Sequence, residues 1–352
     1  MKPATHPQVD YGITVDGRDI TRKIDPRLIS LTLSECRGGE ADQLDLVLND
    51  ADGMLALPPK GALITLKLGW VGQALVDKGS FTVDEIEHSG SPDQLHIRAR
   101  SADMVDTLKQ RAEKSWHGQT LGDIVGEIAG KHGLSPRVDN RLAKVEVDHV
   151  DQTHESDLNF VSRLAKRYDA VATVKKGHLV FLPINGTRSS KGELLASASI
   201  SRADGDQHRF HTADREAYSG VRAYWHDPKK AKRRGVLVGL SGNAKRLRDT
   251  YGSEADALAA AKAEWQRIQR GAATLELTLA LGRPELIPQT PVRVSGFKPA
   301  INAITWLTVK TAHTVSDGGL TTRIELETAD SKSDDGKVED VQADDAAPEA
   351  SE

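Results

Sequence analysis

The densest group of possible metal ligands lies between residues 148 and 157. His149 and His154 stand there among four carboxylates: Asp148, Asp151, Glu155 and Asp157. Zinc is held by imidazoles and carboxylates that converge on one point, usually from one helix face or from paired strands. We assign this stretch to a loop that leads into a helix starting near Ser156, where negative charge favours the helix N-terminus. The pattern therefore indicates a helix start, and we predict no metal site.

A basic run is the sharpest local charge feature of the sequence. Its members are Lys229, Lys230, Lys232, Arg233 and Arg234. Such a run can hold phosphate oxygens by electrostatics alone, but no aromatic residues are interleaved with it to stack bases. It lies between two predicted strands, at 221–225 and 236–240. We interpret it as a solvated hairpin tip or a docking contact for an acidic neighbour, with nucleic-acid binding as the alternative.

Motifs that would indicate catalysis are missing from the sequence. It contains no phosphate-binding loop, dinucleotide fingerprint, nucleophile elbow or metalloprotease histidine pair. Glycosidase carboxylates pair in space, so a cell-wall-degrading enzyme stays open as an alternative. His88 and His313 lie in predicted strands, and the single cysteine, Cys36, excludes an intramolecular disulfide. We predict no catalytic residue, no cofactor and no enzymatic activity.

The elements that carry these residues change type along the chain. Leucines, isoleucines and alanines alternate with polar residues at 44–48, 64–68 and 95–99, which predicts strands with one buried face. Helical spacing follows Thr120 and Ser156, and a hairpin follows at 170–182. Strict alternation returns at 275–281.

From this pattern we predict a mainly β protein with an α+β insertion. Many short strands separated by turn signals favour antiparallel barrels. The predicted domains are a first tube-like β-barrel at 8–112, an α+β module at 113–188, a second tube-like β-barrel at 189–330 with a helix near 253–270, and a disordered acidic tail at 331–352.

A weak internal repeat supports two similar barrels. Residues 57–70 and 286–297 share prolines, alternating aliphatic residues and a glycine beside an aromatic residue. Downstream, the seven-residue spacings of Phe81, His88 and Leu95 recur in one later triplet: Trp306, His313 and Leu320. We therefore predict that 12–103 and about 190–330 superpose.

Charge and hydropathy set the remaining limits. The chain of 352 residues has a net charge of -4. Residues 330–352 contain nine acids and two lysines, a charge of -7, which leaves the rest of the chain at +3. The tail has almost no large apolar residue, so we expect it to be disordered and dispensable for folding. No apolar run is long enough to cross a bilayer and the first residues lack a hydrophobic core, so we expect neither membrane anchoring nor a secretory signal.

Three stretches resemble the phage late control protein D family. The first is 116–121, with Trp116, Thr120 and Leu121; the third is the C-terminal run that contains Trp306 and His313. The second is 155–165, and its signature residues are Glu155, Ser156, Asp157, Phe160 and Leu164. The chain departs from the expected pattern in the stretch Tyr168, Asp169 and Ala170, where a glycine would be usual after the helix.

The resemblance implies a structural role. This family is the baseplate hub of contractile tails and is related to the hub portion of type VI secretion spikes. Its members have two tube-like barrels and an α+β insertion, and they form homotrimers whose six barrels join a hexameric tail tube to a trimeric central spike. The implied partners are the spike, the tail tube, the tape measure protein and other baseplate proteins. The implied location is the baseplate of a virion or tail-like particle, with assembly in the bacterial cytoplasm.

Overall fold

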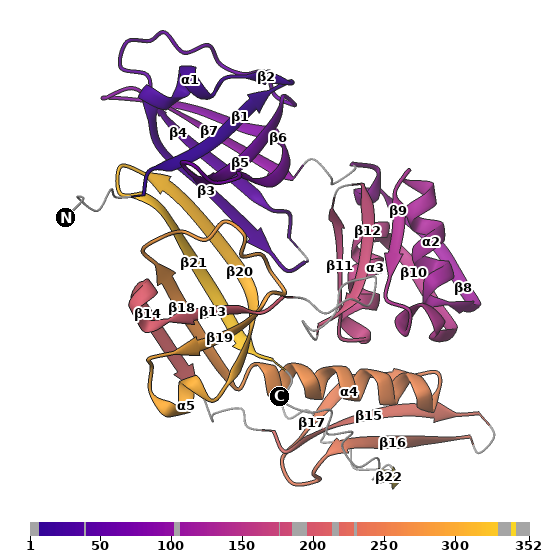
Figure 1. Ribbon diagram of the computed structural model, residues 1–352. Helices are drawn as coiled ribbons and strands as arrows, with labels where there is room; N and C mark the ends of the chain where they lie inside the picture. The colour runs from indigo at the N-terminus through magenta and orange to yellow at the C-terminus, as the bar shows by residue number, and fades with distance from the viewer. Residues whose placement is uncertain are drawn as a thin grey trace, which may run out of the picture.

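Four units, each with its own hydrophobic core, make up the molecule (Figure 1). The computed structural model describes residues 7–38, 40–101, 106–175, 177–184, 196–212, 218–228, 231–329 and 339–342. Strands dominate every unit except the α+β module, which confirms the predicted mainly β class with an α+β insertion. In the described residues no helix is long and apolar enough to cross a membrane.

The first unit is an antiparallel sheet with a short helix, α1 (Thr21–Ile24). Leu44, Leu46 and Leu48 are at most 3% exposed, so the predicted alternation does place one face in the core. Pairing runs in the order β3-β4-β7-β6-β5-β1-β2. The strands are β1 (Val9–Val15), β2 (Arg18–Asp19), β3 (Leu28–Cys36), β4 (Gln43–Asn49), β5 (Leu63–Trp70), β6 (Val76–Ser89) and β7 (Gln94–Ser101).

The second unit is the α+β module, which contains both helices predicted there. Its first pair of strands, β8 (Arg111–Thr120) and β10 (Glu146–Ser156), forms a separate antiparallel ribbon. The helices α2 (Leu121–Lys131) and α3 (Asp157–Arg167) each begin directly after one of these strands. A three-stranded sheet completes the module with β9 (Ser135–Val138), β11 (Ala170–Lys175) and β12 (His178–Pro183).

The third unit repeats the strand order of the first. Its pairing order is β13-β19-β20-β21-β18-β14, which matches β1-β5-β6-β7-β4-β3 position by position, except that β13 runs parallel to β19 while β1 runs antiparallel to β5. A short helix, α5 (Pro299–Asn302), lies between two of its strands. The strands are β13 (Ala198–Ser201), β14 (Gly205–Thr212), β18 (Ala273–Leu279), β19 (Pro291–Ser295), β20 (Thr305–Ser316) and β21 (Gly319–Thr328).

One strand pair joins the two similar units into a single sheet. The C-terminal half of β20, Lys310–Ser316, pairs antiparallel with β3, so the sheet runs without interruption from β14 to β2. Val315 and Leu320, at the tip of the β20–β21 hairpin, belong to the core of the first unit. In the described residues the pairing path does not return on itself, so neither predicted barrel is closed by hydrogen bonds. Superposition of the two units stays a prediction.

The fourth unit corrects the predicted extent of the second barrel. We expected 221–225 and 236–240 to belong to it, but β15 (Gly220–Asp227), β16 (Lys232–Gly239) and β17 (Ala244–Tyr251) form a separate sheet. The helix α4 (Glu254–Arg270) covers one face of this sheet and buries Ala257 and Ala261 against it. An amphipathic helix that follows three short strands can bury its apolar face on them. The fourth unit therefore has a hydrophobic core of its own, between α4 and its sheet.

The acidic tail also differs from the prediction in one segment. The short strand β22 (Glu339–Gln342) pairs antiparallel with β16 and forms the edge of the fourth sheet. The rest of the predicted disordered tail lies outside the described residues.

Candidate functional site

The signature residues of the α+β module form its core and its helix caps. Trp116 stacks on Phe160 with ring centroids 5.9 Å apart, and Leu121 and Leu164 are at most 1% exposed. Thr120 caps α2: its hydroxyl accepts the Asp123 N–H at 3.2 Å, and the Asp123 carboxylate accepts the Thr120 N–H. These contacts hold the module together.

The start of α3 is fixed by a buried carboxylate. Ser156 caps the helix by accepting the Asn159 N–H at 3.2 Å. Asp157 is 2% exposed, and its Oδ2 lies 2.7 Å from both Lys131 Nζ and His132 Nε2. Burial raises the pKa of Asp157, but hydrogen bonds from Gln152, Lys131 and His132 outweigh it and leave the pKa below its ordinary value. Asp157 thus ties α3 to the end of α2, while Glu155 pairs with Arg163 at 2.8 Å on the surface.

The histidines considered as metal ligands lie on a strand, not in the loop we predicted. His149 is on β10, where it pairs in register with His117 of β8, and the two rings stack with centroids 4.5 Å apart. His154, also on β10, lies 3.2 Å from Glu113. Among the residues that the structure describes, no three histidine, cysteine or acidic side chains gather as a metal site.

The basic run lies at the start of β16, and aromatic rings do accompany it. Lys229 and Lys230 lie outside the described residues, and Lys232 is exposed. The Arg233 guanidinium lies 4.1 Å from the ring centre of Tyr224, and Arg234 lies 5.6 Å from that of Trp225. Both rings belong to the neighbouring strand β15. They are not interleaved with the basic run in the sequence, so the sequence pattern did not predict these contacts.

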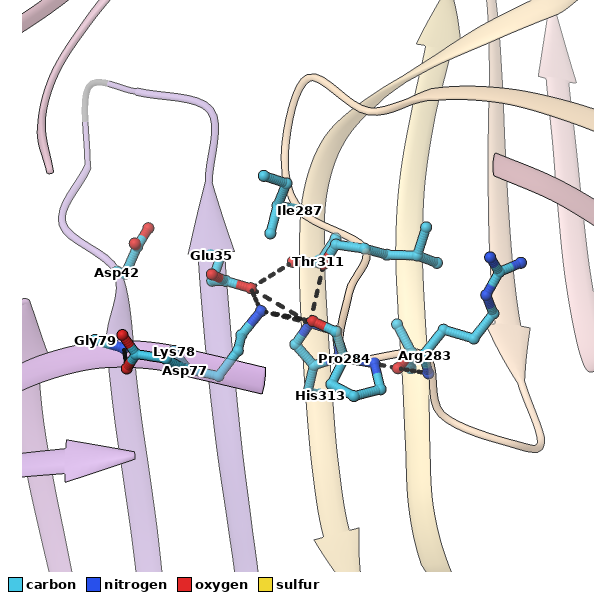
Figure 2. A network of polar contacts seen from close by, with 12 residues as sticks. Glu35, Asp42, Asp77, Lys78, Gly79, Arg283, Pro284, Ile287, Thr311 and His313 are labelled. Carbon is cyan, nitrogen blue, oxygen red and sulfur yellow. Dashed lines mark hydrogen bonds and ion pairs between the residues drawn. The ribbon is translucent and has the colours of Figure 1, made fainter. Parts of the chain in front are cut away.

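A buried charge network lies where the first and third units meet (Figure 2). Lys78 of β6 places its Nζ 2.6 Å from Glu35 Oε2 of β3 and 3.0 Å from the Pro284 carbonyl oxygen of the third unit. His313 Nε2 of β20 lies 3.3 Å from the same Glu35 oxygen and 3.2 Å from the Leu286 carbonyl. The side chains of Lys78 and His313 are at most 1% exposed. Strands from both halves of the molecule therefore share one desolvated set of charges.

The partners of His313 fix its tautomer. Both oxygens near Nε2 are acceptors, so Nε2 carries the proton and donates. Nδ1 lies 2.9 Å from the Thr322 hydroxyl, which itself accepts the Arg283 N–H at 2.9 Å. That hydroxyl therefore donates to Nδ1, and a neutral imidazole satisfies the contacts with Glu35, Leu286 and Thr322, while the Lys78 ammonium lies 3.4 Å from Nε2. Burial, with the nearby Lys78 charge, lowers the pKa of His313, although Glu35 opposes the shift.

This network predicts a loss of stability in acid. Burial raises the pKa of Glu35, but His313 and Lys78 outweigh it and lower the pKa from 4.5 to about 2. A group with a lower pKa in the folded state stabilises above its unfolded pKa, and this contribution is lost as pH falls. We expect the urea midpoint of unfolding to decrease as the pH falls below 6.5, the ordinary pKa of histidine, and to decrease again as the pH falls below 4.5, the ordinary pKa of glutamate. His313→Asn, which cannot titrate, should flatten the first drop; an unchanged drop would contradict this assignment.

A second buried network joins the α+β module to α4 and the large sheet. Arg270, at the C-terminal end of α4, is 1% exposed and donates its Nη1–H to Asp169 Oδ2 at 2.5 Å. Its Nε lies 3.2 Å from Glu327 Oε1 of β21, and Arg37 pairs with the same carboxylate. Asp169 lies in the stretch 168–170, where a glycine was expected, and its φ of 50° is left-handed. The chain keeps an aspartate there, and its carboxylate binds the buried guanidinium.

A cleft of about 750 Å³ opens between the two halves and the module, with Glu35, Lys78, Lys175 and Arg283 among its lining residues. Lys175 pairs with Asp42 across it. Lys78, Glu35 and His313 bind one another and two backbone carbonyls across the junction. These contacts hold the two halves in place. Trp306, also buried, donates its Nε1–H to the Ile301 carbonyl at 3.2 Å. The site residues predicted from the sequence are thus split between the module, the junction and β16.

Comparison with known proteins decides the family. The model of the phage tail baseplate hub (GPD) family matches residues 27–319. The chain belongs to the phage tail baseplate hub family. Probable baseplate hub proteins of Escherichia phages 186 and P2 are each 43% identical over 358 residues, covering 90% of this hub and 92% of the relative. The resemblance to the late control protein D family is therefore confirmed, and the hub is a structural component of a tail baseplate.

Solved structures share the fold of the hub at low sequence identity. The 43 kDa tail protein of prophage MuSo2 from Shewanella oneidensis matches with a TM-score of 0.68 and 16% identity, over 90% of the hub and 98% of that chain. The E. coli c3393 protein, a type VI secretion component, matches with a TM-score of 0.53 and 14% identity, over 91% and 77%. These likenesses extend the hub fold from phage tails to secretion spikes.

Proposed function

We propose that the hub forms a homotrimer whose two similar units per copy make a ring of six that seats a hexameric tail tube. The observation that carries this proposal is the repeated strand order of the two units, joined rigidly by the β3–β20 pairing. Two similar units per chain convert a three-fold axis into six near-equivalent positions. The buried charges of the junction support the proposal because they keep the two units at one mutual orientation.

The ends of the large sheet supply the contact between copies. Among the described residues β14 pairs only with β18, and the edge of β1 opposite β5 pairs only at Thr14 and Val15. A head-to-tail contact between these two edges would continue the sheet from copy to copy, and a closing rotation gives a ring. Exposed edges also invite uncontrolled pairing, so their burial in a ring stabilises the assembled form.

The spike, tail tube, tape measure and other baseplate proteins are the proposed partners, with assembly in the bacterial cytoplasm. The E. coli type VI protein is described as structurally similar to the T4 tail proteins gp27 and gp5. A shared fold supports a comparable position between tube and spike for this hub. The protein then acts by matching symmetries, and we propose no enzymatic activity. Release of fragments from purified peptidoglycan would contradict the last point.

Native mass spectrometry of the hub with its cognate spike tests the trimer, and the expected species contains three hub chains. Successive N–H groups of a strand point to opposite sides. One of Gln207→Pro and His208→Pro on β14 therefore removes a donor to β18 and reduces folding, while the other removes an outward donor. We expect the variant that loses the outward donor to fold with an unchanged melting temperature and to lose the trimer. A monomeric wild-type hub that still joins tube and spike in electron micrographs would overturn the proposal.

A further inference from the structure

The edge of β16 opposite β15 pairs with a segment from the far end of the chain, β22. In the ladder with β22, Leu237 pairs with Glu339 and Arg234 pairs with Gln342. Without β22, β16 would pair only with β15 and expose a row of backbone donors and acceptors. Such an edge accepts an extended peptide by strand addition.

The charge of this edge selects an acidic segment. Beyond Arg234, away from the β22 ladder, β16 continues to Arg233 and Lys232. In the sequence, Asp344 and Asp345 come shortly after Gln342, and residues 330–352 together carry -7. Strand pairing and charge therefore act in the same direction.

Arg233 of this edge is held in place before a partner binds, and Arg246 of β17, on the other side of β15, contacts the same ring. Tyr224 is 7% exposed and lies between two guanidinium groups, with Arg233 at 4.1 Å and Arg246 at 4.8 Å from its ring centre. Cation–π contacts of this kind restrict the side chains. Arg233 and Arg246 are both exposed. Less ordering is thus needed when carboxylates approach.

We propose that the edge of β16 is a docking site for an acidic extended strand and that the hub's own C-terminal tail occupies it as a strap. Residues 339–342 supply the backbone pairing, and the net charge of -7 over residues 330–352 is opposite to the charge of Lys232 and Arg233 on β16. The strap covers the edge and prevents it from pairing with another chain. Since four residue pairs hold the described part of the strap, the attachment is reversible and weakens with salt.

Hydrogen exchange on the full-length hub tests the strap. Because N–H groups alternate, the double variant Val341→Pro/Gln342→Pro must remove a donor to β16 while it keeps the tail charge. We expect exchange to speed up at least about tenfold at those amides of residues 234–237 that point toward β22, as expected when a backbone hydrogen bond is lost, while the amides that point toward β15 stay protected. Ala346→Pro, which adds a proline outside β22, is the matched control and should leave these amides unchanged.

A second pair of measurements separates charge from strand pairing. Lys232→Gln/Arg233→Gln should also speed exchange at the amides of residues 234–237 that point toward β22, and added salt should reproduce that effect in the wild type. A peptide of residues 331–352, added to the double proline variant, should restore protection, whereas a scrambled peptide of equal charge should not. Unchanged exchange in the double proline variant would overturn the proposal, as would protection that disappears on dilution, which would assign the strand to a second copy.

Discussion

Replacing Lys78 with methionine is expected to lower the free energy of unfolding by about 3–5 kcal/mol, the cost of leaving a buried charge without its partner. Methionine keeps the apolar stem but removes the ammonium that lies 2.6 Å from Glu35. The Glu35 carboxylate would then stay buried with only the neutral donors of His313 and Thr311. The Pro284 carbonyl would lose the Lys78 donor as well. Urea unfolding at pH 7 measures the change.

Comparison with the double variant Lys78→Met/Glu35→Gln isolates the charge. If the loss comes from an unpaired carboxylate, removing its charge should recover a large part of the lost stability. If the double variant is as unstable as the two single losses added together, the residues act independently and the network is not the lock between the halves. The proposed ring depends on this lock, so the single variant should also reduce trimer formation at temperatures where each half is still folded.

Much of the fold follows from local periodicity. Leu44, Leu46 and Leu48 alternate because one face of β4 meets the core and the other meets water. The caps at Thr120 and Ser156 are also local, since a side chain binds an amide three residues away. The strand β10 was not predicted because its buried residues do not alternate. Val147, Val150 and Gln152 are spaced by three and then two positions, and the ladder with β8 is irregular between Gln152 and Glu155.

The junction could not be predicted because it is made entirely of distant pairs. Glu35, Lys78 and His313 come together only after β20 has paired with β3, and no local pattern encodes that pairing. The internal repeat was misleading at this point. His88 and His313 share a spacing, but His88 faces Leu95 with a side chain 41% exposed, whereas His313 faces Thr322 and is fully buried. A different hairpin register gave the two histidines different environments.

The edge of the fourth sheet depended on the same kind of long-range pairing. The low hydrophobicity of the tail predicts that it has no packed core, because such a segment has too little apolar surface to bury. It does not exclude backbone pairing, which any non-proline sequence can supply at an open edge. Opposite charges on β16 and the tail are visible in the sequence, but the two segments are about a hundred residues apart.

Replacing Asp169 with glycine is expected to destabilise the hub, although glycine suits the backbone there better. The left-handed φ of 50° costs about 1 kcal/mol for a residue with a Cβ, and glycine would remove that cost. The same change leaves the Arg270 guanidinium, 1% exposed, without its closest carboxylate, a loss of about 3–5 kcal/mol. Glu327 remains 3.2 Å from Arg270 Nε and limits the damage. We therefore expect a net loss of about 2 kcal/mol in thermal or urea unfolding.

Asparagine at the same position separates the two contributions. Asp169→Asn tolerates the left-handed conformation and keeps a hydrogen-bond acceptor, but it removes the charge that faces Arg270. Its stability should lie between those of the wild type and Asp169→Gly. A glycine variant more stable than the wild type would show that backbone strain outweighs the ion pair, and that the module is held to α4 by other contacts. Arg167, which pairs with Asp256 of α4, would then be the first to test, because it is the next charged link between α3 and α4.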